Sequence, residues 1–204
     1  MPDLALESRY AGARVCGIDE AGRGPLAGPV VAAAVVFRKE RPPSRLLSRL
    51  QDSKLLTPAV RAELLPEIYE HAEVGLGSAT VEEIDRVNIL QATFLAMKRA
   101  LAALDEPPSV ALVDGNQRPK LDCQVETVVG GDGLSASIAA ASIVAKVTRD
   151  RLMIELAEQH PGYGWKHNMG YGTPEHLEAL ARLGVTAHHR RSFRPVYELL
   201  AISA

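Results

Sequence analysis

Four carboxylate side chains stand where short apolar runs of the sequence stop and glycine-containing turns begin: Asp19, Glu20, Asp114 and Asp132. The runs before them have the length and the β-branched content of strands, and the glycines leave the backbone open to a ligand. The ends of strands in an α/β sheet line the ligand crevice. We therefore expect the four carboxylates to meet at one edge of a sheet if the first and fourth strands are neighbours.

Such a cluster favours a site for divalent cations. Two carboxylates about 5 Å apart repel each other by roughly 3 kcal/mol at an effective dielectric near 20, so four cannot all stay ionised without cations. Oxygen ligands favour Mg²⁺ or Mn²⁺ over zinc, and two such ions can catalyse phosphodiester cleavage. The alternative is that Asp-Gly pairs are common turn residues, which explains any one position but explains four together poorly.

The elements that must position these residues alternate along the chain, which predicts an α/β fold with a mixed β-sheet flanked by helices and with C-terminal helices. Strands are expected at about 15–19, 30–37, 74–79, 110–113 and 123–129, with the first two paired. Helices are expected from Thr57-Pro58, from the capping box of Thr80 with Glu83, over 135–159, and from Thr173-Pro174 to Gly184. Pro66 should kink or restart its helix. Residues 1–13 are expected to form a tail or short lead-in, and 38–50 a loop or short helix.

Composition sets the broad class. The 204 residues predict a single domain over 1–204, with a core at about 14–185 and an extension at about 186–204. With 47% hydrophobic and only 4% aromatic residues, Leu, Val, Ile and Ala must form the core. Cys16 and Cys123 lie in apolar runs and indicate core thiols in a reducing compartment. No membrane segment is evident, and we expect a cytoplasmic monomer.

A long series of motifs resembles the ribonuclease HII family, the type 2 ribonucleases H. The resemblance begins with Gly17-Ile18-Asp19-Glu20-Ala21-Gly22-Arg23-Gly24-Pro25-Leu26-Ala27-Gly28-Pro29-Val30 and runs through Asp52-Ser53-Lys54 and Val113-Asp114-Gly115. It continues through the segment 138–150 and ends with Gly170-Tyr171-Gly172-Thr173 and the segment 189–193. It covers about residues 14 to 195.

The resemblance implies a ribonuclease H-like fold and an endoribonuclease that uses two Mg²⁺ or Mn²⁺ ions. It further implies cleavage of the RNA strand of RNA/DNA hybrids and of single ribonucleotides in duplex DNA, leaving 3′-hydroxyl and 5′-phosphate ends. Asp19, Glu20, Asp114 and Asp132 match the metal-binding and catalytic carboxylates. The positions expected to bind substrate are Gly22, Arg23, Gly24, Ser53, Lys54, Lys146, Tyr171 and Arg190. One departure is Gly130, where members often carry Lys, so a phosphate contact is in doubt.

Two other classes compete with this interpretation. Gly22, Gly24 and Gly28 fit a loose dinucleotide-binding spacing, but Pro29 would then fall in the helix that receives the pyrophosphate. A nucleic-acid-binding protein without catalysis is the other alternative, and its carboxylates would repel phosphate unless metals were bound.

Several residues near the C-terminus remain open between a binding role and a packing role. Arg190 and Arg191 could contact the nucleic-acid backbone or be buried, and Trp165 and Tyr163 could form an aromatic platform or anchor a loop. His167, His188 and His189 are expected at the surface because they lack partners at ligand spacing. The segment 146–194 is richer in Lys and Arg than in Asp and Glu, which suggests either a basic face or ordinary solvated helices.

Overall fold

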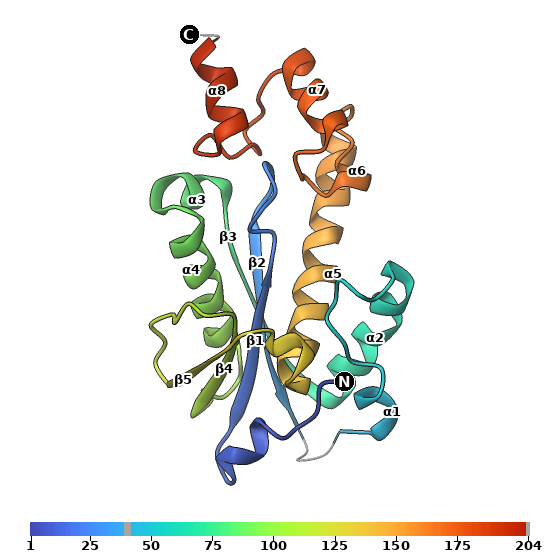
Figure 1. The fold of residues 1–204 in the computed structure, drawn as a ribbon, viewed down its shortest axis with the longest axis vertical. Coiled ribbons are helices and arrows are strands. Elements are labelled where there is room, and N and C mark those ends of the chain that lie inside the picture. The colour runs from blue at the N-terminus through green and yellow to red at the C-terminus, as the bar shows by residue number, and fades with distance from the viewer. Residues whose placement is uncertain (39–41, 203–204) are drawn as a thin grey trace.

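A five-stranded mixed sheet forms the centre of the protein (Figure 1). The computed structural model describes residues 1–38 and 42–202. The strand order is β3-β2-β1-β4-β5, and the strands are β1 (Val15–Ala21), β2 (Val30–Phe37), β3 (Ala72–Ala79), β4 (Val110–Asp114) and β5 (Gln124–Val128). All five strands match the expected positions within a few residues. β1 and β2 pair antiparallel, as expected, whereas β1 with β4 and β4 with β5 pair parallel.

Helices cover both faces of this sheet, and the long β2 is buried on both sides (Figure 1). On one face, Ala32 and Ala34 pack with helix α4 (Ile89–Ala102), which is preceded by the short α3 (Val81–Val87). On the other face, Ala33 and Val35 pack with α5 (Ala136–Gln159) and α2 (Pro58–His71). Alternate residues of a strand point to opposite faces, so small apolar residues at every position suit a strand between two helical layers.

The helix starts follow the capping signals of the sequence. Thr57 accepts a hydrogen bond from the amide of Val60, and Thr80 and Glu83 form both bonds of the capping box. The expected restart at Pro66 is wrong, because α2 continues to His71. Pro66 is solvent-exposed, so water can satisfy the carbonyl whose partner the proline removes.

Two terminal regions complete the fold. Short helices α6 (Trp165–Asn168), α7 (Pro174–Leu183) and α8 (Arg194–Ile202) follow α5 at one end of the molecule (Figure 1). Val196 of α8 packs with Leu26 and Leu180, so the C-terminal helices lie against the glycine-rich turn after β1.

The N-terminal segment is a short lead-in that packs beside the sheet, which was one of its two expected forms. Residues 1–13 are not a tail: they contain the 3₁₀ helix η1 (Glu7–Tyr10), and Leu6 and Tyr10 pack beside β4 and β5. Lack of periodicity concealed this because so short a segment buries only a few side chains. The expectation for 38–50 is met by the short helix α1 (Ser44–Leu47), while residues 39–41 of that range lie outside the described residues.

Candidate active site

The pairing of β1 with β4 brings two of the carboxylates to one edge of the sheet. Ile18 is the register partner of Val113, and the next residues along these parallel strands are Asp19 and Asp114. Parallel strands direct their carboxyl ends to the same edge. The condition stated for the cluster, that the first and fourth strands be neighbours, is therefore met.

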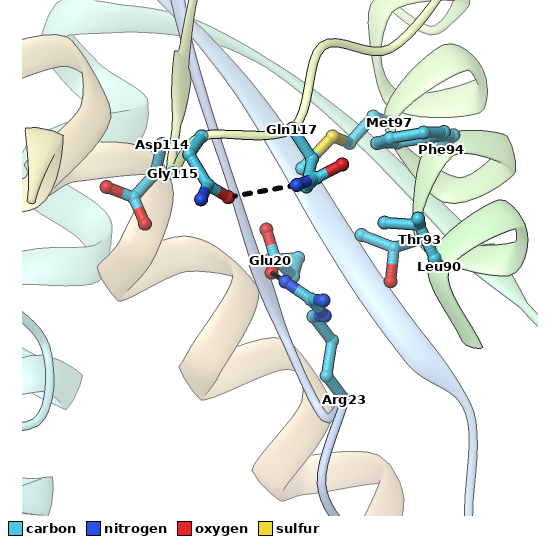
Figure 2. Close-up of a pocket in the computed structure, with 10 residues that line it drawn as sticks. Glu20, Arg23, Leu90, Thr93, Phe94, Met97, Asp114, Gly115 and Gln117 are labelled. Carbon is cyan, nitrogen blue, oxygen red and sulfur yellow. Dashed lines mark hydrogen bonds and ion pairs between the residues drawn. The ribbon is translucent and has the colours of Figure 1, made fainter. Parts of the chain in front are cut away.

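Asp19 and Glu20 leave β1 on opposite sides, because successive side chains of a strand alternate. Asp19 is buried, and its Oδ1 accepts a hydrogen bond from the Glu20 amide at 2.7 Å. The hydroxyl of Ser142 on α5 favours the charged form of Asp19 and so acts to lower its pKa. Glu20 lines a pocket on the α4 side, and one of its oxygens lies 3.3 Å from the guanidinium of Arg23 (Figure 2). Burial, with repulsion from Glu20 and Asp114, raises the pKa of Asp19 well above its usual range. Burial also raises the pKa of Glu20, although Arg23 opposes that shift.

The fourth carboxylate lies in the glycine-rich turn after β5, within the 3₁₀ helix η2 (Gly131–Gly133). The amide of Gly131 donates to Asp114 Oδ1 at 2.7 Å, which ties this turn to the end of β4. Burial, with repulsion from Asp52 and Asp114, raises the pKa of Asp132. Asp52 is thus a fifth carboxylate that belongs to this cluster.

The carboxylates are close enough to repel one another but do not form a finished cage. Across residues 1–38 and 42–202, no three His, Cys, Asp or Glu side chains are placed to hold a metal ion as they stand. The donors are nevertheless all carboxylate oxygens, and repulsion within the cluster contributes to the raised pKa of Asp19, Glu20 and Asp132. A hard divalent cation would relieve that repulsion, so the donor set fits Mg²⁺ or Mn²⁺.

Lys54 lies at the open side of the cluster. Burial alone would lower the pKa of its ammonium, but attraction to Asp52, Asp19, Asp132 and Asp114 outweighs this and raises the pKa. The backbone amide of Lys54 donates to Asp52 Oδ1 at 2.9 Å, and this bond helps to shape the loop that carries Lys54. The exposed side chain of Lys54 is therefore a cation held beside the carboxylates.

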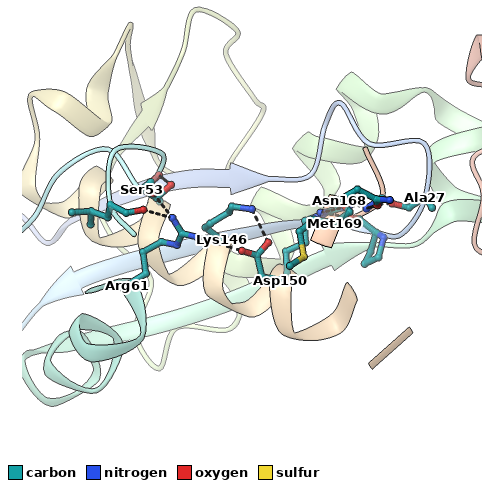
Figure 3. A network of polar contacts seen from close by, with 12 residues as sticks. Ala27, Ser53, Arg61, Lys146, Asp150, Asn168 and Met169 are labelled. Atoms are coloured by element: carbon teal, nitrogen blue, oxygen red, sulfur yellow. Dashed lines mark hydrogen bonds and ion pairs between the residues drawn. The ribbon is translucent and has the colours of Figure 1, made fainter. Parts of the chain in front are cut away.

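Hydrogen bonds from Arg61 support the loop that contains Ser53 (Figure 3). Buried Arg61 donates to the carbonyl oxygens of Ser53 at 2.7 Å and Leu56 at 2.6 Å. The hydroxyl of Ser53, a residue expected to bind substrate, is buried against Ser142 at 2.8 Å, so only the backbone of Ser53 is left to face a substrate. Lys146, another residue expected to bind substrate, is partly exposed, and its Nζ lies 2.6 Å from Oδ1 of Asp150 on the same helix.

Two buried arginines hold the turn between β1 and β2. Arg149 donates to the carbonyl oxygens of Ala27, Pro29 and Met169, and Arg190 donates to those of Gly22, Arg23 and Gly28. Burial lowers the pKa of Arg149 to about 10 and that of Arg190 to about 9. The expected contact of Arg190 with substrate is thus corrected: its side chain is fully buried and orients the turn.

The glycines of this turn have different roles. Gly22 has φ +98°, and a Cβ there would lie 2.0 Å from Nε of Arg149, so Gly22 faces the protein interior. The expectation that a side chain at this position would push away a sugar is therefore wrong, since it would strike Arg149 first. Gly24 is exposed, and a Cβ there would lie 3.4 Å from the ring of Tyr171. Gly24 and Tyr171 thus form one exposed surface.

The aromatic residues divide in the same way. Tyr171 is 46% exposed, whereas Tyr163 and Trp165 are buried and stacked with ring centroids 5.1 Å apart. Of the two alternatives for Tyr163 and Trp165, the loop anchor is therefore confirmed.

A histidine pair supports the backbone of Tyr171. The Nε1–H of Trp165 donates to Nε2 of His176 at 3.0 Å, so Nδ1 of His176 carries the proton that it donates to the Tyr171 carbonyl at 2.9 Å. His189 Nε2 lies 3.1 Å from His176 Nε2 and completes the network. The expected surface position of His189 is wrong, because it is buried, and burial lowers its pKa to about 4.

Several supporting residues escaped prediction from the sequence. They are Asp52, Arg61, Ser142, Arg149 and His176. Asp52, Ser142 and Arg149 lie inside motifs that carry the family resemblance, which is the signal by which they could have been found. Arg61 and His176 lie in helices with no distinguishing local pattern.

Within the described ranges, no helix is both long enough and apolar enough to cross a membrane. Cys16 and Cys123 are free thiols, and Cys16 is buried in the core.

Comparisons with known proteins agree with this geometry. The family model described as Ribonuclease HII matches residues 16–197. Ribonuclease HII of Paramagnetospirillum magneticum is 62% identical over 200 residues, covering 98% of this chain and 99% of the relative. The ribonuclease H2 of Pyrococcus horikoshii OT3 superposes with a TM-score of 0.79 at 28% identity, covering 93% of this chain and 98% of that one. Bst-RNase HIII in complex with Mn²⁺ has a TM-score of 0.77 at 19% identity over 100% and 74% of the two chains, a likeness of fold alone.

Proposed function

The chain belongs to the ribonuclease HII family and is a metal-dependent ribonuclease H, and from this premise we propose how its residues bind and cleave substrate. Its mixed sheet with flanking helices is the ribonuclease H-like fold. Ribonuclease H activity on RNA/DNA hybrids follows from the family. We propose in addition that the enzyme cleaves at single ribonucleotides within duplex DNA and leaves 3′-hydroxyl and 5′-phosphate ends.

The observation that supports the proposal best is the edge of the sheet where Asp19 and Asp114 follow paired residues of two parallel strands. We propose that Asp19, Glu20, Asp114 and Asp132 hold two Mg²⁺ or Mn²⁺ ions. When bound, such ions supply an activated water and stabilise the leaving oxygen of the phosphodiester. Glu20 must turn from Arg23 toward the other carboxylates, which frees the Arg23 guanidinium for a phosphate.

A cleavage assay tests the proposed activity directly. The protein is incubated with a DNA duplex containing one ribonucleotide, and separately with an all-RNA strand paired with DNA, each with Mg²⁺, with Mn²⁺ or with EDTA. Cuts in both substrates that require metal and carry the stated ends are expected. A protein that binds these duplexes without cutting either would instead match the non-enzymatic nucleic-acid-binding alternative.

Lys54 is proposed to contact a substrate phosphate once metal has neutralised the carboxylates that now attract its ammonium. Lys54→Ala should lower the slope of log affinity against log salt by about 0.9, the value for one lost phosphate contact. Binding is measured with metal present on a duplex with a non-cleavable linkage at the ribonucleotide. Lys54→Arg keeps the charge and should keep the slope. An unchanged slope for Lys54→Ala would return Lys54 to the role of a solvated loop residue.

Tyr171 and the turn at Gly24 are proposed to recognise the junction between a ribonucleotide and the next deoxyribonucleotide. Gly24 lets backbone groups approach a 2′-hydroxyl, and the Tyr171 ring beside it would pack on the following deoxyribose. An aromatic contact with a nucleotide is worth about 1–3 kcal/mol.

Tyr171→Ala should therefore cut the single-ribonucleotide duplex about tenfold more slowly or worse, and it should lose much less on the all-RNA hybrid. The paired control is Tyr197→Ala, which removes an exposed tyrosine from α8 and should leave both rates unchanged. Equal losses on the two substrates would show that Tyr171 does not read the junction.

A further inference from the structure

The N-terminal segment contacts the part of the chain that carries Asp132. The amide of Asp3 donates to the Leu134 carbonyl at 3.1 Å, and the amide of Ala136 donates to the Asp3 carbonyl at 2.8 Å. These bonds form a short parallel bridge between Asp3 and Ser135. We call residues 3–10 the N-terminal clamp. It lies outside the residues matched by the family model.

Glu7 makes the central contact of the clamp. Its Oε1 accepts hydrogen bonds from the Ser135 hydroxyl at 2.6 Å, the Ser137 hydroxyl at 2.7 Å and the Ser137 amide at 3.0 Å. These donors form the start of α5, where a carboxylate is favoured by the free amides and by the helix dipole. Glu7 therefore connects the clamp to the helix that begins four residues after Asp132.

The turn that carries Asp132 is packed at Gly131 and Asp132, which are buried, and open at the residues on either side of them. Gly130 has φ +66°, and a Cβ at Gly130 or at Gly133 would meet nothing within 4 Å. Leu134, the residue that leaves the turn, is 54% exposed. Glycines in open space retain many backbone conformations, so bonds from outside the turn add to the turn's own backbone hydrogen bonds in restricting them. Those bonds come from Asp114 on one side and from the clamp on the other.

The start of α5, which Glu7 holds through Ser135 and Ser137, also positions Asp19. A Cβ on Gly17 would lie 2.5 Å from the Ser137 hydroxyl and 2.2 Å from the Ser137 carbonyl carbon, so the start of α5 rests directly on β1. Gly17 stands two residues before Asp19, and α5 carries Ser142, whose hydroxyl favours the charged form of Asp19. Movement of the start of α5 would therefore shift Asp132 and Asp19 relative to each other.

We propose that Glu7 is a positioning residue for the metal site, which holds Asp132 at the correct distance from Asp19 and Asp114 through Ser135 and Ser137. This inference rests on the proposed function, because it takes Asp132 as a metal ligand. Partners that orient metal ligands typically change metal affinity by about 10–100-fold when they are removed. Among the described residues, Glu7 Oε2 is buried without a hydrogen-bond partner, so the bonds to Oε1 are what this carboxylate contributes.

The test measures Mn²⁺ binding to the substrate-free protein, by calorimetry and by electron paramagnetic resonance of the unbound ion, at a temperature where every variant is folded. Glu7→Ala should weaken binding by about tenfold, and activity should return at saturating Mn²⁺. Glu7→Gln keeps an acceptor oxygen and should bind Mn²⁺ like the wild type. Ser137→Ala removes one donor, should weaken binding in the same direction, and replaces Glu7→Ala if that variant does not fold.

Two controls separate this inference from the proposed function. Tyr10→Phe breaks the clamp's contact with Glu126 on β5 but leaves Ser135 and Ser137 bonded, so it should not change Mn²⁺ affinity. Asp132→Asn should weaken binding, and Glu7→Ala added to it should have little further effect. Wild-type affinity in Asp132→Asn would overturn the proposed ligand set. Weakened affinity in Asp132→Asn with wild-type affinity in Glu7→Ala and Ser137→Ala would overturn the clamp alone.

Discussion

Asp19→Asn should lose cleavage activity by about 10³-fold or more, while its metal-free form is as stable as the wild type or slightly more stable. Charge stabilisation by bound metal is worth several kcal/mol in the transition state, and each 1.36 kcal/mol is about tenfold in rate. Asp19 is buried beside Ser142 and is repelled by Glu20 and Asp114. The amide keeps the shape of the side chain and removes the buried charge. The metal-free fold therefore loses a repulsive interaction, while the reaction loses a metal ligand.

The pH dependence of stability gives this prediction a second measurement. The folded-state pKa of Asp19 is raised, so its effect on stability is most favourable below the unfolded pKa of about 3.9 and is lost as pH rises through the folded pKa. Metal-free wild type should therefore fall behind Asp19→Asn in thermal stability as pH rises. Adding Mn²⁺ should raise the melting temperature of the wild type more than that of the variant.

The control for Asp19→Asn is Asp105→Asn, which changes an exposed aspartate after α4 and should alter neither activity nor stability. Near-full activity in Asp19→Asn would remove the basis for the two-metal assignment. A metal-free Asp19→Asn protein that is clearly less stable than the wild type would contradict the electrostatic argument.

Arg190→Met should lower the free energy of unfolding by about 3 kcal/mol or more, because a buried acceptor left without a donor costs about 1–3 kcal/mol. Arg190 donates to the carbonyl oxygens of Gly22, Arg23 and Gly28, and its guanidinium carbon lies 5.0 Å from the ring centre of Phe193. Methionine fills similar volume but donates no hydrogen bond. The turn should then become mobile, and the rate of cleavage should fall with the stability.

Urea unfolding at 25 °C measures the effect, and the neighbouring residue supplies the control. The side chain of Arg191 is exposed, so Arg191→Met should change stability by no more than about 0.5 kcal/mol. If Arg190→Met unfolds at the wild-type urea concentration but binds substrate poorly, Arg190 contacts nucleic acid after all. That result would show that the buried Arg190 becomes accessible when substrate binds.

Comparison of Arg190 with Arg191 shows that local sequence patterns do not predict which of two neighbouring arginines is buried. Nothing in the local sequence separates Arg190 from Arg191, because both follow His189 in a segment without helical or strand period. Arg190 is buried and Arg191 exposed because Arg190 faces the carbonyl groups of a turn more than 160 residues earlier. The burial of His189 has a similar cause, since its ring nitrogen lies 3.1 Å from that of His176, a residue 13 positions earlier on α7.

Local chemistry, in contrast, was enough to place most elements. Threonine caps, a capping box and a proline at a first helical turn act within a few residues, so they located the starts of α2, α3 and α7. Continuous small apolar residues located β2 because a strand between two helical layers is buried on both faces. Pro66 shows the limit of such rules, since solvent exposure can make a helix tolerate a proline.

The candidate site also has features that the sequence predicts and features that only the tertiary structure shows. Residue type and order were enough to select Asp19, Glu20, Asp114 and Asp132, because acidic residues at strand ends and the surrounding motifs are properties of the chain itself. The meeting of Asp19 with Asp114 at one edge of the sheet, and the nearness of Asp132 to Asp52, depend on contacts between distant segments. The clamp is the clearest case: Glu7 in an unremarkable segment meets Ser135 and Ser137 only because folding brings residues about 130 positions apart within hydrogen-bonding distance.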